Sequence, residues 1–116
     1  MGVNRPLGIG AGSLALIAFL PREDFEAVVS ANAKRYKMFN NLTADIIREL
    51  AQKSQKRGYV LSEGLFWPGV TSISVLVHDQ NKKIVAAITV TAISSRFTRE
   101  RQKRVAEIIK RHAGLI

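Results

Sequence analysis

The sequence contains no cysteine, which excludes disulfides, thiolate metal sites and thiol nucleophiles. This absence agrees with a reducing compartment, and we expect a cytoplasmic protein. Long apolar runs are missing as well. The longest run, Leu14 to Leu20, ends at Pro21 and is far shorter than the ~20 residues needed to span a bilayer. We therefore expect no membrane span, no secretory signal and no membrane partner.

Acidic residues are few: the 116-residue chain has 9 Asp and Glu against 18 Lys and Arg, a net charge of +9. Much of the basic excess lies in Lys53 to Arg57 and Arg96 to Arg111, both within expected helices. This placement favours solvated helix faces, and a basic surface also attracts phosphates. With 47% hydrophobic residues, and neither repeats nor low-complexity linkers, the chain is predicted to form one domain, residues 1–116.

Hydrophobic periodicity predicts an α+β fold with three helices, then three strands, then a last helix. The expected helices are Ser13 to Leu20, Pro21 to about Ala33, a helix capped by Thr43 and ended by Gly58, and a last helix capped by Thr98, with Val105, Ile108, Ile109 and His112 on one stripe. The expected strands are Tyr59 to Glu63, Val70 to His78 and Lys83 to Ala92, and Lys34 to Asn41 is expected to be a polar connection.

A four-residue turn at Asp79 to Lys82 is predicted to fold the last two strands into an antiparallel hairpin. One face of the hairpin then carries hydroxyl side chains, and the other carries aliphatic side chains that must pack under helices. The expected pairs are His78 with Lys83, Ser74 with Ala87, Ser72 with Thr89 and Val70 with Thr91. The hydroxyl face is Ser72, Ser74, Thr89 and Thr91, and the aliphatic face is Ile73, Val75, Val77, Ile84, Ala86, Ile88 and Val90.

Two stretches are candidate binding sites, each with a structural alternative. The hydroxyl face either lines the solvent side of the sheet or forms the floor of a cavity for a small polar ligand. The glycine-rich stretch Gly8 to Ser13 either is a ligand-free entry loop or binds a carboxylate or phosphate at a helix start. Its G-x-G-x-G spacing, with no useful strand before it, does not fit a dinucleotide fingerprint.

The sequence shows no catalytic constellation. Ser13 lacks the flanking pattern of a nucleophile elbow, and neither His78 nor His112 has a partner at metal-ligand spacing. The carboxylates at the start of the second expected helix are explained by the helix dipole. We therefore expect a protein that is not an enzyme and holds no metal and no cofactor.

Six short motifs follow one another along nearly the whole chain. They are RPLGIGAGSLAL at residues 5–16, LP at 20–21, KRGY at 56–59, PGVTSI at 68–73, AAITV at 86–90 and RFT at 96–98. In this order and at these spacings they resemble the effector-binding domain of the IclR family of bacterial transcriptional regulators.

The resemblance implies a GAF-like or profilin-like fold, with helices on an antiparallel sheet and a pocket for a small organic acid or aromatic metabolite. Gly8 and Leu14 stand where many family members have His and a basic residue. Many members also have acidic residues around positions 62–65, where this chain has only Glu63. The resemblance therefore leaves the identity of the effector open. Carried onto this chain, the ligand-binding positions are Ala11, Gly12, Ser62, Val70, Ser72, Thr89 and Thr91.

The resemblance also implies partners. The family's winged helix-turn-helix domain, its linker and the first strands of its sensing domain have no counterpart in this sequence. We therefore expect DNA contact only through that separate domain of an intact regulator. The incomplete sheet predicts an exposed edge or face covered by a partner copy in a homodimer or tetramer. The rival interpretation is a nucleic-acid-binding module that uses the basic residues of the last helix.

Overall fold

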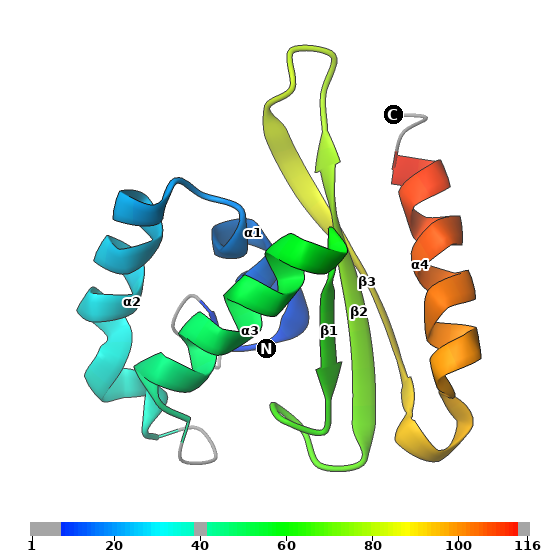
Figure 1. The fold of residues 1–116 in the computed structure, drawn as a ribbon, viewed down its shortest axis with the longest axis horizontal. Coiled ribbons are helices and arrows are strands. Elements are labelled where there is room, and N and C mark those ends of the chain that lie inside the picture. Colours follow the sequence, from blue (N-terminus) through cyan, green and yellow to red (C-terminus); the bar gives the residue numbers. More distant parts are fainter. Residues whose placement is uncertain (1–7, 39–41, 114–116) are drawn as a thin grey trace.

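The computed structural model describes residues 8–38 and 42–113. They form four α-helices and a three-stranded antiparallel sheet in the predicted order αααβββα (Figure 1). The helices are α1 (Ala11–Ala18), α2 (Arg22–Tyr36), α3 (Ala44–Arg57) and α4 (Arg99–Ala113). The strands are β1 (Val60–Glu63), β2 (Val70–His78) and β3 (Ile84–Ile93), and a short 3-10 helix, Ser94–Arg96, leads from β3 to α4.

The helices cover both faces of the sheet (Figure 1). α1 packs against one face, with α2 and α3 on its outer side, and α4 packs against the opposite face. Because α1 is enclosed by the sheet and by other helices, it is apolar around most of its circumference. One core cluster, which includes Leu14, Tyr36 and Ile47, fills the α1 side, and another, which includes Ile73 and Ile109, fills the α4 side.

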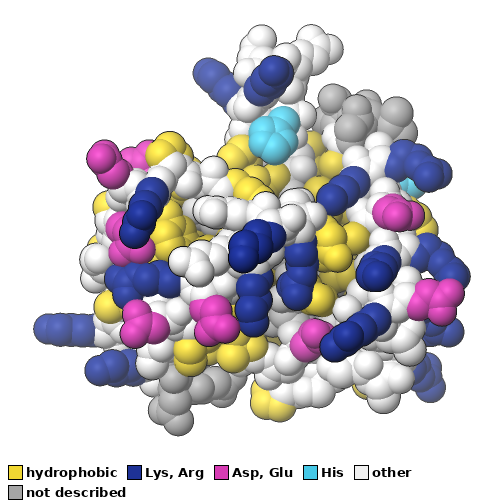
Figure 2. All heavy atoms as spheres, viewed as in Figure 1, with side chains coloured by type: hydrophobic (Ala, Val, Ile, Leu, Met, Phe, Trp, Pro, Cys, Tyr) yellow, Lys and Arg dark blue, Asp and Glu magenta, His cyan; other side chains and the backbone are white. Residues whose placement is uncertain are grey.

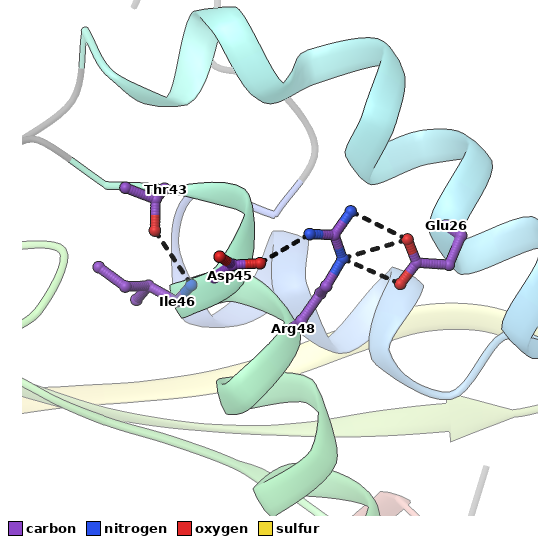
Figure 3. Close-up of polar contacts among 5 residues, drawn as sticks. All are labelled: Glu26, Thr43, Asp45, Ile46 and Arg48. Atoms are coloured by element: carbon purple, nitrogen blue, oxygen red, sulfur yellow. Dashed lines mark hydrogen bonds and ion pairs between the residues drawn. The ribbon is translucent and has the colours of Figure 1, made fainter.

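Three predicted helix boundaries are confirmed, each by a local contact. Thr43 caps α3, because its hydroxyl oxygen accepts a hydrogen bond from the backbone N–H of Ile46 at 3.2 Å (Figure 3). Gly58 ends α3 with a left-handed φ of 84°. At the start of α4, the hydroxyl oxygen of Thr98 accepts from the backbone N–H of Arg101 at 3.3 Å.

The first two helices depart from their predicted limits. α1 begins and ends two residues earlier than expected. α2 continues through Lys34 to Tyr36, which the prediction assigned to a polar connection. Tyr36 is fully buried against α1 and α3, so tertiary packing extends the helix beyond the polar residues that suggested its end. Residues 39–41 of the expected connection lie outside the described residues.

The hairpin register differs from the prediction by two residues. The loop has five residues rather than four, closed by a hydrogen bond from the backbone N–H of Asp79 to the carbonyl of Lys83 at 2.8 Å. A β-bulge beside His78 then leaves Val85 without an opposite residue. The pairs observed are His78 with Ile84, Ser74 with Thr89, Ser72 with Thr91 and Val70 with Ile93. Because side chains alternate with a period of two, this shift keeps the hydroxyls together on one face.

Burial of the two sheet faces also differs from the prediction. Ile84, which was predicted on the aliphatic face, pairs instead with His78 on the hydroxyl face and is 38% exposed. On the aliphatic face, Ile73, Val75 and Val77 of β2 are buried, but Val90 of β3 is 36% exposed. The cause is that β3 is an edge strand and α4 packs mainly over β2. The hydroxyl face is not simply solvent-exposed either, because α1 lies on it.

The predicted stripe of α4 is confirmed in part: Ile109 is buried and Val105 packs partly buried against the core. The buried residues of α4 are Gln102, Ala106, Ile109 and Ala113, whereas Ile108 is 45% exposed and His112 is exposed. The side-chain amide of Gln102 donates to the carbonyl of Phe97 at 2.9 Å and to the carboxylate of Glu63 at 3.2 Å. A polar residue is tolerated in the buried row because its amide is hydrogen-bonded.

Candidate ligand-binding site

Five hydroxyl side chains meet on the face of the sheet that α1 covers. Ser62, Ser72 and Thr91 lie opposite one another across the three strands. Two residues further along β2, Ser74 pairs with Thr89 on the same face. The side-chain oxygens of Ser72 and Thr91 are 2.9 Å apart, and the hydroxyl of Thr89 donates to that of Ser74 at 3.0 Å. We call these five residues the hydroxyl patch.

The hydroxyl patch is buried on one side and accessible on the other. Ser62, Ser72 and Ser74 are 3%, 8% and 0% exposed, whereas Thr89 and Thr91 on the edge strand are exposed. A hydroxyl group both donates and accepts and rotates freely, so the two threonines can exchange bonds within the patch for bonds to a ligand. The patch contains no ionisable side chain, and what it offers is neutral donors and acceptors.

The start of α1 lies directly against the hydroxyl patch. A Cβ atom added to Gly12 would be 3.0 Å from Oγ1 of Thr89, so glycine allows the helix backbone to approach the strand closely. Gly10, at the N-cap with a φ of 100°, has no side chain to cap the first N–H groups. These N–H groups have no intrahelical partner and lie at the positive end of the helix dipole, which favours an anion. The backbone N–H of Gly8 donates to the hydroxyl of Ser13 at 3.0 Å and holds the glycine-rich stretch against the helix.

The structure brings together most of the predicted ligand-binding residues. Gly12, Ser62, Ser72, Thr89 and Thr91 lie in or against the patch. Two other predicted residues lie at its border: Ala11 is 5% exposed within the α1 core, and Val70 is half-buried opposite Ile93. Binding by these seven residues stays a prediction. Ser74 also belongs to the patch; strand alternation had placed it on the predicted hydroxyl face, although it is not among the positions carried over from the family.

Several surface hollows lie away from the hydroxyl patch. One of about 300 Å³ lies between α2 and α3, next to Phe25 and Arg48. Another of about 530 Å³ lies between β3 and α4, next to Val90 and Arg101. Helix α1 covers the hydroxyl patch. A ligand would therefore reach the patch from the side of β3, where Thr89 and Thr91 are exposed.

Arg48 of α3 forms the charged contact between α2 and α3. Its guanidinium donates to the carboxylate of Glu26 at 3.0 and 3.1 Å and to that of Asp45 at 2.8 Å (Figure 3). These two hydrogen-bonded carboxylates raise the pKa of Arg48. Because the two carboxylates neutralise the charge of Arg48, we interpret this cluster as a structural ion pair that links α2 and α3 rather than as an anion-binding site.

The basic excess is spread over the surface. Figure 2 shows Lys and Arg side chains over the whole visible face, with Asp and Glu among them. On α4, Arg101, Lys103 and Arg111 are exposed, and Arg104 pairs with Glu100 at 3.4 Å. This exposure agrees with the solvated helix face that the sequence favoured.

The family model described as the C-terminal domain of bacterial IclR transcriptional regulators matches residues 1–116. The chain belongs to the IclR family. The HTH-type transcriptional regulator KipR of Bacillus subtilis strain 168 is 24% identical over 113 residues, which are 95% of this IclR-family chain and 44% of KipR. The chain thus spans less than half the length of this curated relative.

Solved structures of IclR regulators share the fold. The Thermotoga maritima IclR superimposes with a TM-score of 0.79 at 22% identity, over 93% of this chain and 44% of that one. The inducer-binding domain of PobR from Acinetobacter, a double mutant in complex with 3-hydroxybenzoic acid, gives 0.78 at 18% identity, over 98% of this chain and 66% of that one. The predicted family and fold are confirmed. Within residues 8–38 and 42–113, no helix has the length and apolarity to cross a membrane.

Proposed function

We propose that this IclR-family domain binds a small organic acid or aromatic metabolite at the hydroxyl patch and acts as a sensor within a transcriptional regulator. The observation that carries the proposal is the close contact between the first turn of α1 and Thr89. The first backbone N–H groups of α1, which have no partner within the helix, lie near exposed hydroxyls, and together they are a set of donors suited to a carboxylate. The 3-hydroxybenzoic acid bound to the PobR domain, which shares the fold, supports an aromatic acid as the ligand class.

The chemistry of the hydroxyl patch favours binding over catalysis. Its hydroxyls bond to one another, and neither a histidine nor a carboxylate stands among them to activate a nucleophile. KipR, a relative of this chain, is likewise named as a transcriptional regulator. We therefore propose a sensing role without a reaction.

The intact regulator would contact DNA through a winged helix-turn-helix domain outside these 116 residues. In this proposal the sensing domain also contributes to assembly into a homodimer or tetramer, because symmetric self-association is the usual way to match a two-fold DNA site. The cytoplasm is the compartment where such a regulator meets its promoter.

Ligand binding can be measured as a shift of the thermal unfolding midpoint, Tm, against a panel of benzoic, hydroxybenzoic and aliphatic carboxylic acids. A ligand at 100 times its Kd adds about 2.7 kcal/mol to the stability of the folded state, or about 10 °C for a domain of this size. In the Thr89→Val/Thr91→Val double variant this shift should be lost. The matched control is Thr71→Val on the opposite face of β2, where the hydroxyl contacts only Ser94 at 2.8 Å in the described structure.

Two results would contradict the proposal. One is a panel in which no acid raises Tm, and the other is a shift that survives in the double variant. Binding to duplex DNA across a salt series tests the rival function: tight association that falls steeply with salt would favour a nucleic-acid-binding module using α4, whereas we expect weak association at every salt concentration.

A further inference from the structure

Strand β2 extends beyond β1, the strand that pairs with one of its two sides. β1 begins at Val60, which lies opposite Ser74, whereas β2 continues to His78. The reason is Gly58, whose left-handed φ of 84° turns the chain from α3 into β1 only at this level. Figure 1 shows the hairpin of β2 and β3 projecting past the start of β1. Within the part of the chain that the structure describes, the last residues of β2 therefore have a strand on their β3 side only.

The direction of the backbone groups along β2 follows from one hydrogen bond. The backbone N–H of Gly64 donates to the carbonyl of Val70 at 2.9 Å, so Val70 faces the β1 side. Backbone groups alternate between the two sides of a strand. Leu76 and His78 therefore direct their N–H and C=O groups toward the side on which β1 has not yet begun. The bond that closes the hairpin loop agrees, because the N–H of Asp79 is directed toward the β3 side.

A groove of about 540 Å³ lies along this open side of β2. A smaller hollow of about 210 Å³ shares four of its residues and extends the groove toward Phe19 at the end of α1. The floor of the groove is β2, one wall is the end of α3 and the other wall is α4. We call this groove the β2 notch. The residues of the notch on which its chemistry depends are Gly58, Val75, Leu76, His78, Lys110 and Ala113.

Lys110 gives the β2 notch a positive charge. Its Nζ lies 5.1 Å from the centre of the Tyr59 ring and 3.3 Å from the position of a Cβ added to Gly58, so the ammonium group reaches from α4 to the end of α3. No carboxylate of the described residues forms an ion pair with Lys110. Asp79 also lines the notch, but its carboxylate accepts from two backbone N–H groups of its own turn at 2.8 and 2.9 Å. The notch therefore favours a ligand that carries a negative charge.

We propose that the β2 notch binds an extended peptide that carries an acidic side chain. The N–H and C=O groups of Leu76 and His78 repeat about 6.8 Å apart along the strand, a spacing that alternate residues of an extended chain match. A small acid reaches only one of the two. The peptide continues the line of β1 and supplies the strand that β2 lacks at this level.

Strand alternation determines which peptide side chain meets Lys110. Val77 points to the α4 side of the sheet and is packed in its core, whereas Leu76 packs against the core on the α1 side. A peptide residue opposite Val77 therefore points to the α4 side, where Lys110 lies, and we expect it to be Glu or Asp. The neighbouring peptide residue lies opposite Leu76 and should be apolar, because Phe19 packs on the same side.

Hydrogen exchange of the backbone amides, measured by NMR, tests the open side of β2 without any variant. Val75 and Val77 pair with β3, and their amides should be protected, whereas the amides of Leu76 and His78 should exchange at least about tenfold faster. Addition of the peptide should slow the exchange of Leu76 and His78. Equal protection of all four amides in the free chain would overturn the proposal, because this side of β2 would then already be covered.

Fluorescence anisotropy with a fluorescein-labelled pentapeptide, Thr-Val-Glu-Val-Thr, measures binding to the same chain. The order of its residues is the same in both directions, so the probe does not presuppose a parallel or an antiparallel partner. We expect saturable binding that weakens about fivefold in Lys110→Gln, the loss typical of an exposed charge pair. The matched control is Lys103→Gln, which removes the same charge from an exposed position of α4 and should leave binding unchanged.

Two methylated peptides test the backbone pairing separately from the charge. Methylation of both valine nitrogens removes the N–H groups that face β2 and should weaken binding at least about tenfold. Methylation of the glutamate nitrogen, which faces away from β2, should have little effect. Equal losses for the two peptides, or equal losses for the two lysine variants, would contradict the proposed pairing.

The remaining outcomes separate the β2 notch from the hydroxyl patch. Absence of peptide binding, or displacement of the peptide by glutarate at equal concentration, would refute the peptide as the ligand of the notch. Peptide binding should survive in Thr89→Val/Thr91→Val, and the acid-induced rise in Tm should survive in Lys110→Gln. Failure of the peptide site and failure of the sensing function can therefore be told apart.

Discussion

Replacing Gly12 with alanine tests the contact between α1 and the hydroxyl patch. In the first turn of α1, alanine favours the helix by up to about 1 kcal/mol over glycine. The new methyl group would lie 3.0 Å from Oγ1 of Thr89, so this oxygen must move back and its hydrogen bond to Ser74 is weakened. We expect this to cost up to about 1 kcal/mol, the value of a typical hydrogen bond. The two effects should nearly cancel, and Gly12→Ala alone should change the free energy of unfolding by less than about 0.5 kcal/mol.

The informative measurement is the double-mutant cycle with Thr89→Ala. Alone, Thr89→Ala removes the hydrogen-bond partner of the fully buried Ser74, at a cost of about 1–3 kcal/mol. In the double variant the oxygen that opposed the methyl group is gone, so alanine at position 12 gives its full helix gain. The double variant should therefore be about 1 kcal/mol more stable than the two single changes would give if they were additive.

Equilibrium denaturation by urea of the four proteins measures this coupling. The control cycle combines Gly12→Ala with Thr91→Ala, because Thr91 has no atom within 4 Å of the added Cβ. It should be additive within about 0.5 kcal/mol. If the Thr89 cycle were additive too, or if both cycles showed the same coupling, α1 would not rest on Thr89 and the geometry of the proposed site would be wrong.

Three further predictions concern the elements that frame the site. Thr43→Ala removes the cap of α3 and should lower the stability by about 1 kcal/mol, measured as a lower Tm by circular dichroism, whereas Thr43→Ser should retain most of it. Gly58→Ala places a side chain at a φ of 84° and 3.3 Å from Nζ of Lys110, which should cost about 1 kcal/mol in urea denaturation, and Gly58→Asn should cost less. Burial raises the pKa of Tyr36 above 10.0. The stability that the folded state gains from the neutral phenol of Tyr36 is therefore fully present below pH 10.0 and is lost as the pH rises through the folded-state pKa. Stability measured from pH 9 upward should fall less steeply for Tyr36→Phe than for the natural chain, and equal slopes would contradict this reasoning.

The features that the sequence predicted correctly are those set by neighbouring residues. A threonine before a helix and a glycine after it act through bonds within one turn, so Thr43, Gly58 and Thr98 could be placed without knowledge of the fold. Strand alternation is also local, and it put the hydroxyls on one face. The order of elements follows from the same periodicities.

The features that the sequence missed depend on what packs against each element. Tyr36 extends α2 because a core is present to bury it, and Gln102 is buried in α4 because Phe97 and Glu63 bind its amide. The apolar composition of α1 did not indicate that this helix lies on the hydroxyl face. The resemblance to the family singled out Gly12 as a ligand-binding position, but its 3.0 Å approach to Thr89 could not be read from the sequence.

The β-bulge at Val85 decides which face of β3 meets α1. The five-residue loop shifts the pairing by one residue relative to the predicted turn, and this shift alone would exchange the two faces of the strand. Ile88 and Val90 would then lie on the side of Ser72 and Ser74, and the threonines would lie on the α4 side. The bulge supplies the second shift and returns Thr89 to its place beneath Gly12. Loop and bulge are thus correlated: a change in the length of one requires a change in the other if the hydroxyl patch is to remain under α1.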